Sequence, residues 1–446
     1  MYQDTIVAIS TPLGEGGIGI VRLSGPETYS IVCRIFHGRL MKNRSLCYGH
    51  IQDPDSQEII DEVLVSFMAS PHTYTREDMS EINCHGGPAP LQRVLKLVLK
   101  QGARLANPGE FTLMAFLNGR IDLAQAEAVM DIVQAKTETS LAMAMKGLEG
   151  HLSAAIREIR NELLSVLAYI TAKIDFPEDE IEEQEIVPTL KISRDLLCQL
   201  ITGADNGIIY RQGIRTAIVG RPNVGKSSLL NRLLRQDRAI VTPIPGTTRD
   251  TIEETVNIQG IPFVLVDTAG ILDSSDPVES LGIERSRMAI GQADVILFVI
   301  DASSPIVEDD MTILSLLDNK RTLLVANKCD LPQKVQPHQL AKQMVHTSAI
   351  SGIGMIELEQ TMVETALGGK AFTAESLLVS NPRHKNAMER AADSLDQAIS
   401  SAETSVPEEF IAIDLSMAVN ALGEITGETL RDDLLETIFN QFCIGK

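Results

Sequence analysis

The sequence predicts a multidomain chain: an N-terminal α+β domain, a central α-helical domain, and an α/β domain with a mostly parallel sheet inserted into the helical one. Three observations support this prediction. Runs of β-forming residues alternate with turns at the start of the chain, apolar residues recur at helical spacing in its middle and at its end, and compact apolar strands alternate with helices between them. The 446 residues, 44% of them apolar by type, suffice for about three domains with cores of their own.

Residues 1–118 are predicted to form the α+β domain. Short runs of strand-forming residues lie at 5–10, 19–23 and 62–67, and turn residues separate them. Apolar residues at helical spacing over 91–99 predict a helix. This mixture is typical of an α+β domain.

The next segment, residues 119–212, is predicted to be helical. Apolar residues between Leu141 and Ile174 recur every three or four positions, which predicts one long amphipathic helix. The sequence Phe176-Pro177 should end it, because proline cannot continue a helix.

Helical spacing returns at 383–402 and 411–442. Each helical half alone would expose an apolar stripe, so residues 369–446 should complete the helical domain and residues 213–368 should be an insertion into it. Two independent small bundles are the alternative. Within the insertion, apolar strands alternate with helices as in a mostly parallel sheet; the predicted strands lie at 216–220, 263–267, 295–301, 322–328 and 344–349.

Charge and cysteine patterns exclude several classes of protein. The formal net charge is −21, the wrong sign for a chain whose main partner is a bare nucleic-acid backbone. The six cysteines include no Cys-x-x-Cys pair, so neither a disulfide framework nor a thiolate zinc site is expected. The start lacks the pattern of a signal peptide, and no apolar run is long enough to cross a bilayer. We expect a cytoplasmic protein with no membrane partner.

A phosphate-binding loop is the strongest signal in the sequence. Residues 220–227 read Gly-Arg-Pro-Asn-Val-Gly-Lys-Ser, the spacing G-x-x-x-x-G-K-S, directly after one predicted strand and before a helical run. Glycines let backbone N–H groups turn toward a phosphate, and the positive end of the helix dipole adds to the attraction. Lys226 can reach the β and γ phosphates of a nucleotide, and the Ser227 hydroxyl can ligate Mg²⁺.

Three further elements indicate that the nucleotide is GTP. Residues 267–270, Asp-Thr-Ala-Gly, end a buried strand, where the carboxylate can hold the water shell of the metal and the glycine amide can sense a γ-phosphate. Residues 327–330, Asn-Lys-Cys-Asp, end a later strand; the Asp330 carboxylate can accept hydrogen bonds from guanine N1–H and N2–H₂, whereas adenine has an acceptor at N1. The pair Ser-Ala at 348–349 would support the base. Four such elements in this order predict a GTPase domain.

The switch loops depart from the commonest pattern. Residues 246–250, Gly-Thr-Thr-Arg-Asp, place Thr248 where it can reach Mg²⁺ when GTP is bound; a plain polar turn is the alternative. In many switch GTPases a Gln after D-x-x-G orients the attacking water. Here that residue is Ile271, which cannot do so, and the acidic stretch 273–279 is the nearest source of the missing group.

Five segments carry a family resemblance. The motifs Pro-Asn-Val-Gly-Lys-Ser at 222–227 and Gly-Thr-Thr-Arg-Asp at 246–250 resemble those of the TrmE–Era class of GTPases. Three further segments narrow the resemblance to one family of this class: the Pro-Gly-Glu-Phe segment at 108–128, the glycine-rich run at 16–22 and the terminal Cys-Ile-Gly-Lys at 443–446. Over its whole length the chain is similar to the MnmE (TrmE) family of tRNA-modification GTPases.

The resemblance implies a potassium-activated GTPase that forms a homodimer and works with the FAD-binding protein MnmG in a heterotetramer or larger complex. Together they would add an aminomethyl or carboxymethylaminomethyl group to C5 of the wobble uridine of tRNA. A reduced folate, 5,10-methylenetetrahydrofolate or a formyl analogue, would supply the one-carbon unit. The alternative is a GTPase assembly or ribosome-maturation factor without transfer chemistry, which would need neither a folate domain nor the terminal Cys-x-Gly-Lys.

The motifs and the resemblance together name the candidate site residues. The GTP-binding residues are Asn223, Val224, Gly225, Lys226, Ser227, Ser228, Thr242, Pro243, Ile244, Pro245, Gly246, Thr247, Thr248, Asp267, Thr268, Ala269, Gly270, Asn327, Lys328, Asp330, Ser348 and Ala349. The resemblance implies Mg²⁺ ligands Ser227 and Thr248, K⁺ ligands Asn223, Thr242, Ile244 and Thr247, and folate contacts Arg22, Glu81, Arg120 and Lys446.

Two catalytic roles are also implied by the resemblance. Glu279 would orient the attacking water through a bridging water, which fills the gap left at Ile271. Cys443, which by itself could equally be a mere terminal residue, would act at the modification site. The sequence departs from the family at Met114, where Arg is usual, and at Pro245 in the switch loop.

Overall fold

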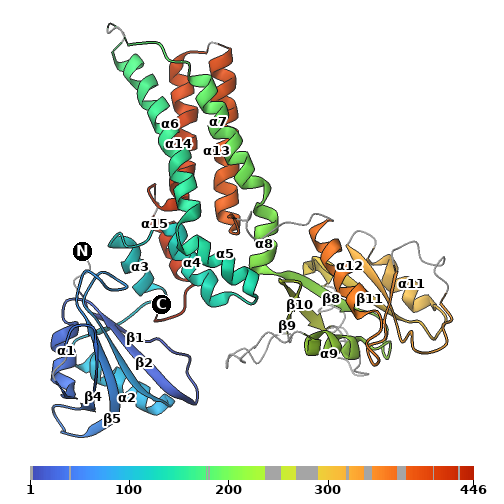
Figure 1. Cartoon of the computed structure of the whole chain (residues 1–446), viewed down its shortest axis with the longest axis horizontal. Helices are drawn as coiled ribbons and strands as arrows, with labels where there is room; N and C mark the ends of the chain where they lie inside the picture. Colours follow the sequence, from blue (N-terminus) through green and yellow to red (C-terminus); the bar gives the residue numbers. More distant parts are fainter. Residues whose placement is uncertain are drawn as a thin grey trace. The chain divides into compact units, whose positions relative to one another are not determined.

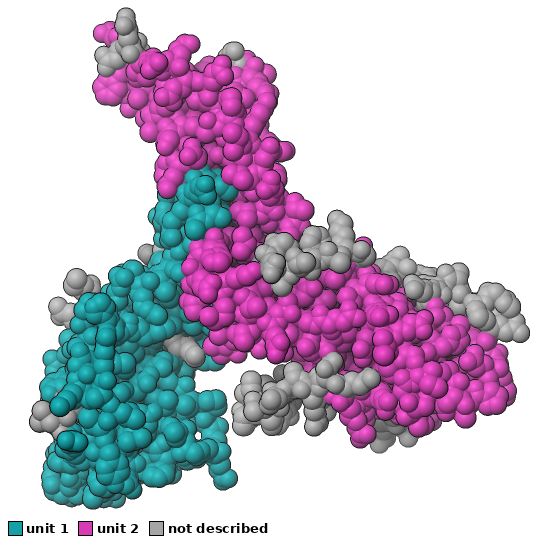
Figure 2. All heavy atoms as spheres, viewed as in Figure 1, with its two compact units in different colours: residues 1–130, 153–160, 419–446 teal, residues 131–152, 161–418 magenta. Residues whose placement is uncertain are grey.

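The chain forms two units. The computed structural model describes residues 4–39, 42–176, 178, 181–236, 253–267, 290–317, 321–335, 344–368, 378–404, 406–429 and 432–445. Unit 1 comprises residues 1–130, 153–160 and 419–446, and unit 2 comprises residues 131–152 and 161–418 (Figure 2). In the described part of the chain, no helix is long and apolar enough to span a membrane.

Unit 1 contains a seven-stranded sheet in the order β3-β4-β5-β6-β2-β1-β7, in which β1 and β7 are parallel and the other neighbours antiparallel. Side chains alternate along each strand, so Val63 and Val65 of β5 are buried whereas Leu64 faces outward. Helices α1 and α2 pack on the buried face. The elements are β1 (Ile6–Ile9), β2 (Gly16–Ser24), α1 (Thr28–Ile35), β3 (Phe36–Gly38), β4 (Ser45–Gln52), β5 (Ile59–Met68), β6 (Met79–Gly86), α2 (Pro88–Lys100) and β7 (Arg104–Leu105).

The C-terminal end of the chain also belongs to unit 1. Helix α15 packs against α3 through the buried side chains of Ile438 and Phe439. The last residues then approach β1, where Gly445 has φ +92° and a Cβ would lie 2.6 Å from the Ile9 carbonyl oxygen, so only glycine fits there. The other helices of unit 1 are α3 (Glu110–Leu117), α15 (Asp432–Phe439) and the part of α4 (Leu123–Gln134) up to residue 130.

Long helices of unit 2 run beside one another (Figure 1). Helix α7 precedes the α/β sheet in the chain and α13 follows it, yet the two pack together and are joined by the ion pairs Arg194–Asp396 (3.0 Å) and Lys191–Glu403 (2.7 Å). The sheet is therefore inserted between helices that form one bundle. The helices are α5 (Glu138–Leu148), α7 (Ile186–Thr202), α8 (Ala204–Gln212) and α13 (Pro382–Glu403), together with parts of α6 (His151–Asp175) and α14 (Glu408–Thr426), whose residues 153–160 and 419–426 belong to unit 1.

One helix prediction is wrong. Apolar spacing predicts a single helix from Leu141 to Ile174, but the chain forms two, α5 and α6. Gly150 between them has φ +85°, a left-handed conformation that interrupts the helix. A break at one glycine leaves the three- and four-residue spacing of the apolar side chains intact, so the pattern alone could not reveal it.

The inserted sheet has six strands in the order β13-β12-β11-β8-β10-β9, all parallel except the β9–β10 pair. Strand β11 is buried on both faces: Leu297 and Val299 lie in the core with α9 and α12, and Phe298 and Ile300 in the core with α11. The carboxyl ends of β8, β12 and β13 meet at one edge, where the predicted nucleotide elements begin. The elements are β8 (Ile214–Val219), α9 (Lys226–Gln236), β9 (Glu253–Ile258), β10 (Ile261–Asp267), β11 (Val295–Asp301), α11 (Glu308–Ser315), β12 (Thr322–Asn327), β13 (Met344–His346) and α12 (Met355–Leu367).

Candidate nucleotide-binding site

The loop between β8 and α9 folds around the side chain of Lys226. The Lys226 Nζ donates hydrogen bonds to the carbonyl oxygens of Gly220 and Arg221, each at 2.9 Å, and the residue is only 4% exposed. Ser227 and Ser228 follow in the exposed first turn of α9. The ammonium group thus lies inside the loop at a helix N-terminus, where a nucleotide phosphate would meet it.

Asn327 joins three of the four predicted elements. Its Nδ2 donates to the Val224 carbonyl oxygen (2.9 Å), and its Oδ1 accepts from the Ala349 backbone N–H (3.1 Å). A Cβ on Gly225 would lie 2.2 Å from this same Nδ2. The phosphate loop, the Asn-Lys-Cys-Asp segment and the buried Ser348-Ala349 pair are therefore in contact at one sheet edge.

Lys328 makes a second link to the phosphate loop. Its Nζ donates to the Asn223 carbonyl oxygen (2.8 Å) and pairs with the Asp301 carboxylate (2.7 Å). Asp301 was not among the site residues predicted from the sequence. Its position at the end of a buried apolar strand, beside Asn327 in the sheet, could have indicated it.

Asp330 is exposed at this edge, so its carboxylate is open to a base. Burial, and next the negative charge of Asp330, raise the pKa of the neighbouring Cys329 thiol. The Cys329 thiol is therefore expected to stay protonated at neutral pH.

Arg221 of the phosphate loop is held by a buried carboxylate. Its Nε lies 2.6 Å from Oδ1 of Asp310, whose side chain is 3% exposed. The other Asp310 oxygen accepts from the Val307 backbone N–H (3.1 Å) at the start of α11. The guanidinium is thus fixed against α11, an ion pair that sequence patterns did not suggest.

Several predicted site residues lie outside the described residues. They are Thr242, Pro243, Ile244, Pro245, Gly246, Thr247, Thr248, Thr268, Ala269, Gly270, Glu279 and Lys446. For Asp267 the backbone is described, at the end of β10, and the side chain is not. Proposals about these residues rest on the sequence.

Two predicted folate residues are in contact in unit 1. Arg22 of β2 faces Glu81 of β6 in register, with Nη2 2.8 Å and Nε 2.9 Å from the same carboxylate oxygen. The Arg22 Nη1 also donates to the Gly445 carbonyl oxygen (3.1 Å). Cys443, two residues earlier, is exposed, and its carbonyl oxygen accepts from the Gly109 N–H (3.4 Å). The terminal segment therefore meets the Arg22–Glu81 pair.

The third described folate candidate, Arg120, contacts Tyr74. Its guanidinium carbon lies 4.6 Å from the centre of the Tyr74 ring, and its Nη1 donates to the Tyr74 carbonyl oxygen (3.2 Å). Met114 is buried in α3. The structure thus brings Arg22 and Glu81 together and places Arg120 against Tyr74.

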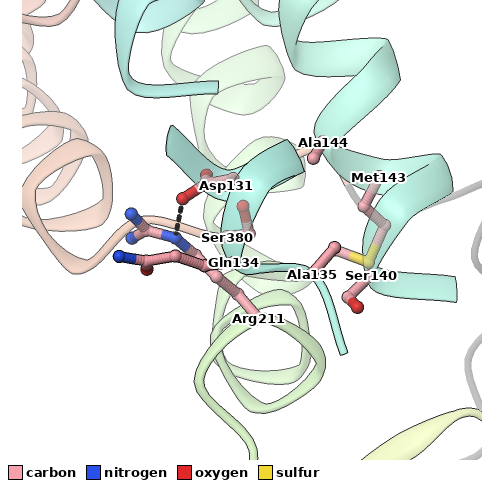
Figure 3. A pocket seen from close by; sticks show the side chains of 8 residues that line it. All are labelled: Asp131, Gln134, Ala135, Ser140, Met143, Ala144, Arg211 and Ser380. Atoms are coloured by element: carbon pink, nitrogen blue, oxygen red, sulfur yellow. Dashed lines mark hydrogen bonds and ion pairs between the residues drawn. The ribbon is translucent and has the colours of Figure 1, made fainter. Parts of the chain in front are cut away.

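A small cavity in unit 2 is not a candidate site. Its volume is about 20 Å³, room for about one water molecule. The ion pair between Arg211 and Asp131, 2.6 Å long, forms part of its wall (Figure 3). The cavity is too small for a nucleotide or a folate; it is lined by Asp131, Gln134, Ala135, Ser140, Met143, Ala144, Arg211 and Ser380.

Two family models match the chain. The model of the GTP-binding protein TrmE N-terminus matches residues 5–120, and the model of the MnmE helical domain matches residues 123–443. The tRNA modification GTPase MnmE of Alkaliphilus oremlandii is 49% identical over 461 aligned positions, and that of Chloroflexus aurantiacus is 51% identical over 453; each match covers 100% of both chains. Among solved structures, Era of Aquifex aeolicus is 31% identical over 40% of this chain and 65% of that chain, with a TM-score of 0.28.

These matches confirm the predicted fold class. The N-terminal model ends before the sheet that carries the phosphate loop, and the match to the helical model begins before this sheet and ends after it. Relatives of about half identity cover every part of the chain, including both ends. The chain belongs to the MnmE family of tRNA modification GTPases.

Proposed function

We propose that this chain is a potassium-activated GTPase that, with the FAD-dependent partner MnmG, adds a (carboxymethyl)aminomethyl group to C5 of the tRNA wobble uridine with a folate one-carbon unit. Membership of the family shows that the chain is a GTP hydrolase that acts in tRNA modification. The potassium ion, the folate and the partner MnmG are what we propose in addition. One observation carries the proposal: Arg22 binds both Glu81 and the Gly445 carbonyl oxygen. This contact joins a charge pair suited to folate with the terminal Cys-Ile-Gly-Lys, and an assembly factor would need neither.

The proposed domains have the bounds predicted from the sequence. Residues 1–118 form the folate-binding and dimerisation domain, residues 119–212 and 369–446 the helical domain, and residues 213–368 the GTPase domain. In the last, the phosphate loop and Asp330 hold GTP, while Ser227 and Thr248 supply hydroxyl ligands to Mg²⁺. The position of Lys226 inside the phosphate loop and of Ser227 in the first turn of α9 fits a bound nucleotide with its metal.

Potassium is proposed as the extra positive charge for hydrolysis, with Asn223, Thr242, Ile244 and Thr247 as its ligands. Some GTPases use an arginine for this purpose. Here the phosphate-loop arginine, Arg221, is already paired with buried Asp310 and is not available to the γ-phosphate. Asn223 is exposed and presents an amide oxygen, a ligand that suits a hard cation.

Hydrolysis by this chain is therefore expected to be about a hundredfold or more faster in potassium chloride than in sodium chloride at matched ionic strength, the scale of one lost electrostatic stabiliser. If potassium also bridges paired GTPase domains, the rate per protein should rise with protein concentration. Steady-state GTP turnover in the two salts measures this, and GDP binding in both serves as the control. Equal turnover in the two salts contradicts potassium activation.

A homodimer is supported by the outward face of the N-terminal sheet. Leu46 and Tyr48 of β4 are each 58% exposed, and Tyr48 pairs in register with Leu64, which is 38% exposed. Adjacent apolar side chains on an open sheet face are typical of an interface.

The folate proposal is tested at Arg22. The Arg22→Gln variant should bind 5-formyltetrahydrofolate about tenfold or more weakly, because it loses charge-assisted hydrogen bonds to Glu81 and to the terminal segment. Cells that lack the protein should lose the C5 modification of tRNA; the unmutated gene should restore it and the Arg22→Gln gene should not.

Arg34→Gln is the matched control, because Arg34 is an exposed arginine of the same sheet domain that donates to the Gln101 carbonyl oxygen. This variant should bind folate and restore modification normally. Unchanged tRNA in cells without the protein contradicts the whole proposal, whereas full modification by Arg22→Gln contradicts only the folate site.

A further inference from the structure

Asp301 is a fixed, partly buried charge at the edge of the nucleotide site, with 15% of its side chain exposed. It ends β11 directly beside Asn327 of β12 in the parallel register. Its carboxylate accepts hydrogen bonds from Lys328 Nζ (2.7 Å), the Ser303 backbone N–H (2.9 Å) and the Ser303 hydroxyl (2.6 Å). Burial raises the pKa of Asp301, but the bonds from Lys328 and Ser303 outweigh it and hold the pKa below its usual value, so the group is ionised at neutral pH.

The single ammonium of Lys328 connects two strained backbone positions. Lys328 has φ +66° and Asn223, whose carbonyl oxygen it binds, has φ +64°. Residues other than glycine rarely adopt this left-handed conformation, and it persists only where the surroundings hold it. The bond to Asn223 and the ion pair with Asp301 are such restraints, and Asp301 determines where the ammonium lies.

We propose that Asp301 is a positioning residue for guanine-nucleotide binding: by fixing the Lys328 ammonium, it holds the segment that carries Asp330 against the phosphate loop at Asn223. The contacts of the Asp301 carboxylate are to Lys328 and Ser303, so it acts through the lysine. The proposal needs only guanine-nucleotide binding, and potassium, folate and the partner protein do not enter it.

Binding of GDP to the full chain tests this. Asp301→Asn should raise the dissociation constant for GDP about tenfold, because the ion pair with Lys328 is replaced by a weaker hydrogen bond from the ammonium to a neutral amide oxygen. Inosine diphosphate should weaken by the same factor, since Lys328 is occupied by Asp301 and Asn223 and does not read the edge of the base. Asp309→Asn, at an exposed carboxylate in the first turn of α11, is the matched control and should bind GDP normally.

A double-mutant cycle shows whether Asp301 acts through the lysine. In a Lys328→Met background, Asp301→Asn should cause no further loss of GDP affinity. Equal, additive losses in both backgrounds overturn the proposal, as does unchanged GDP affinity in the single Asp301→Asn variant.

Ser303→Ala supplies a second variant if Asp301→Asn does not fold. It keeps the charge but removes a hydroxyl that orients the carboxylate. GDP should bind about threefold more weakly in the normal background and unchanged in the Lys328→Met background. A threefold loss that persists without the lysine contradicts a positioning role.

Discussion

Asp330→Asn is expected to weaken GTP binding by about 2–3 kcal/mol, on the order of a hundredfold. The carboxylate accepts two hydrogen bonds from guanine, at N1–H and N2–H₂, and an amide can accept only through its oxygen while its NH₂ faces a donor. Asp330 is exposed and Asn has nearly the same shape, so the fold should be unaffected. Calorimetric titration with GTP and GDP measures the change.

The same titrations with ATP test the choice of base. ATP should bind the unmutated chain far more weakly than GTP, because adenine N1 is an acceptor and would face the carboxylate. Asp309→Asn controls for the loss of one negative charge from the domain and should leave GTP affinity unchanged. ATP that binds as well as GTP contradicts the role of Asp330 as the residue that selects guanine.

The sheet edge that carries the nucleotide-binding motifs was predictable because each motif is a short local sequence. Each motif stands at the end of a buried apolar strand, and parallel strands bring their carboxyl ends to one edge, so the motifs are expected at the same edge. There Asn327 contacts both Val224 and Ala349. Strand β11 was predicted with the same bounds that the structure has, Val295–Asp301, because its run of apolar residues is buried on both faces.

Pairings between distant residues were not predictable. Arg221 and Asp310 are 89 positions apart, and nothing in either local sequence selects the other as partner. The contact of Gly445 with Arg22 spans 423 positions and depends on α15 packing against α3. Arg120 is a further example. Its residue type fits a folate contact, whereas its cation–π packing on Tyr74 became visible only in the fold.

Glu279→Ala is expected to slow single-turnover GTP hydrolysis by about 10²-fold or more, the usual scale for losing a group that orients the nucleophile. The residue after Asp-Thr-Ala-Gly is Ile271, whose apolar side chain cannot position water, and Glu279 is the carboxylate proposed to do so. GTP affinity should be unchanged, because in this role Glu279 contacts water rather than phosphate. Asp276→Ala, in the same acidic stretch, is the matched control and should hydrolyse GTP at nearly the normal rate.

The same variant tests the link between hydrolysis and modification. If modification needs a cycle of closing and opening of the GTPase domains rather than GTP occupancy alone, Glu279→Ala should fail to modify tRNA although its folate site is intact. Normal folate binding by this variant is the internal control. Unimpaired hydrolysis would show that Glu279 is one more solvated carboxylate of an acidic loop. Lost hydrolysis with full wobble-uridine modification would instead separate the two activities, because bound GTP alone would then suffice for modification.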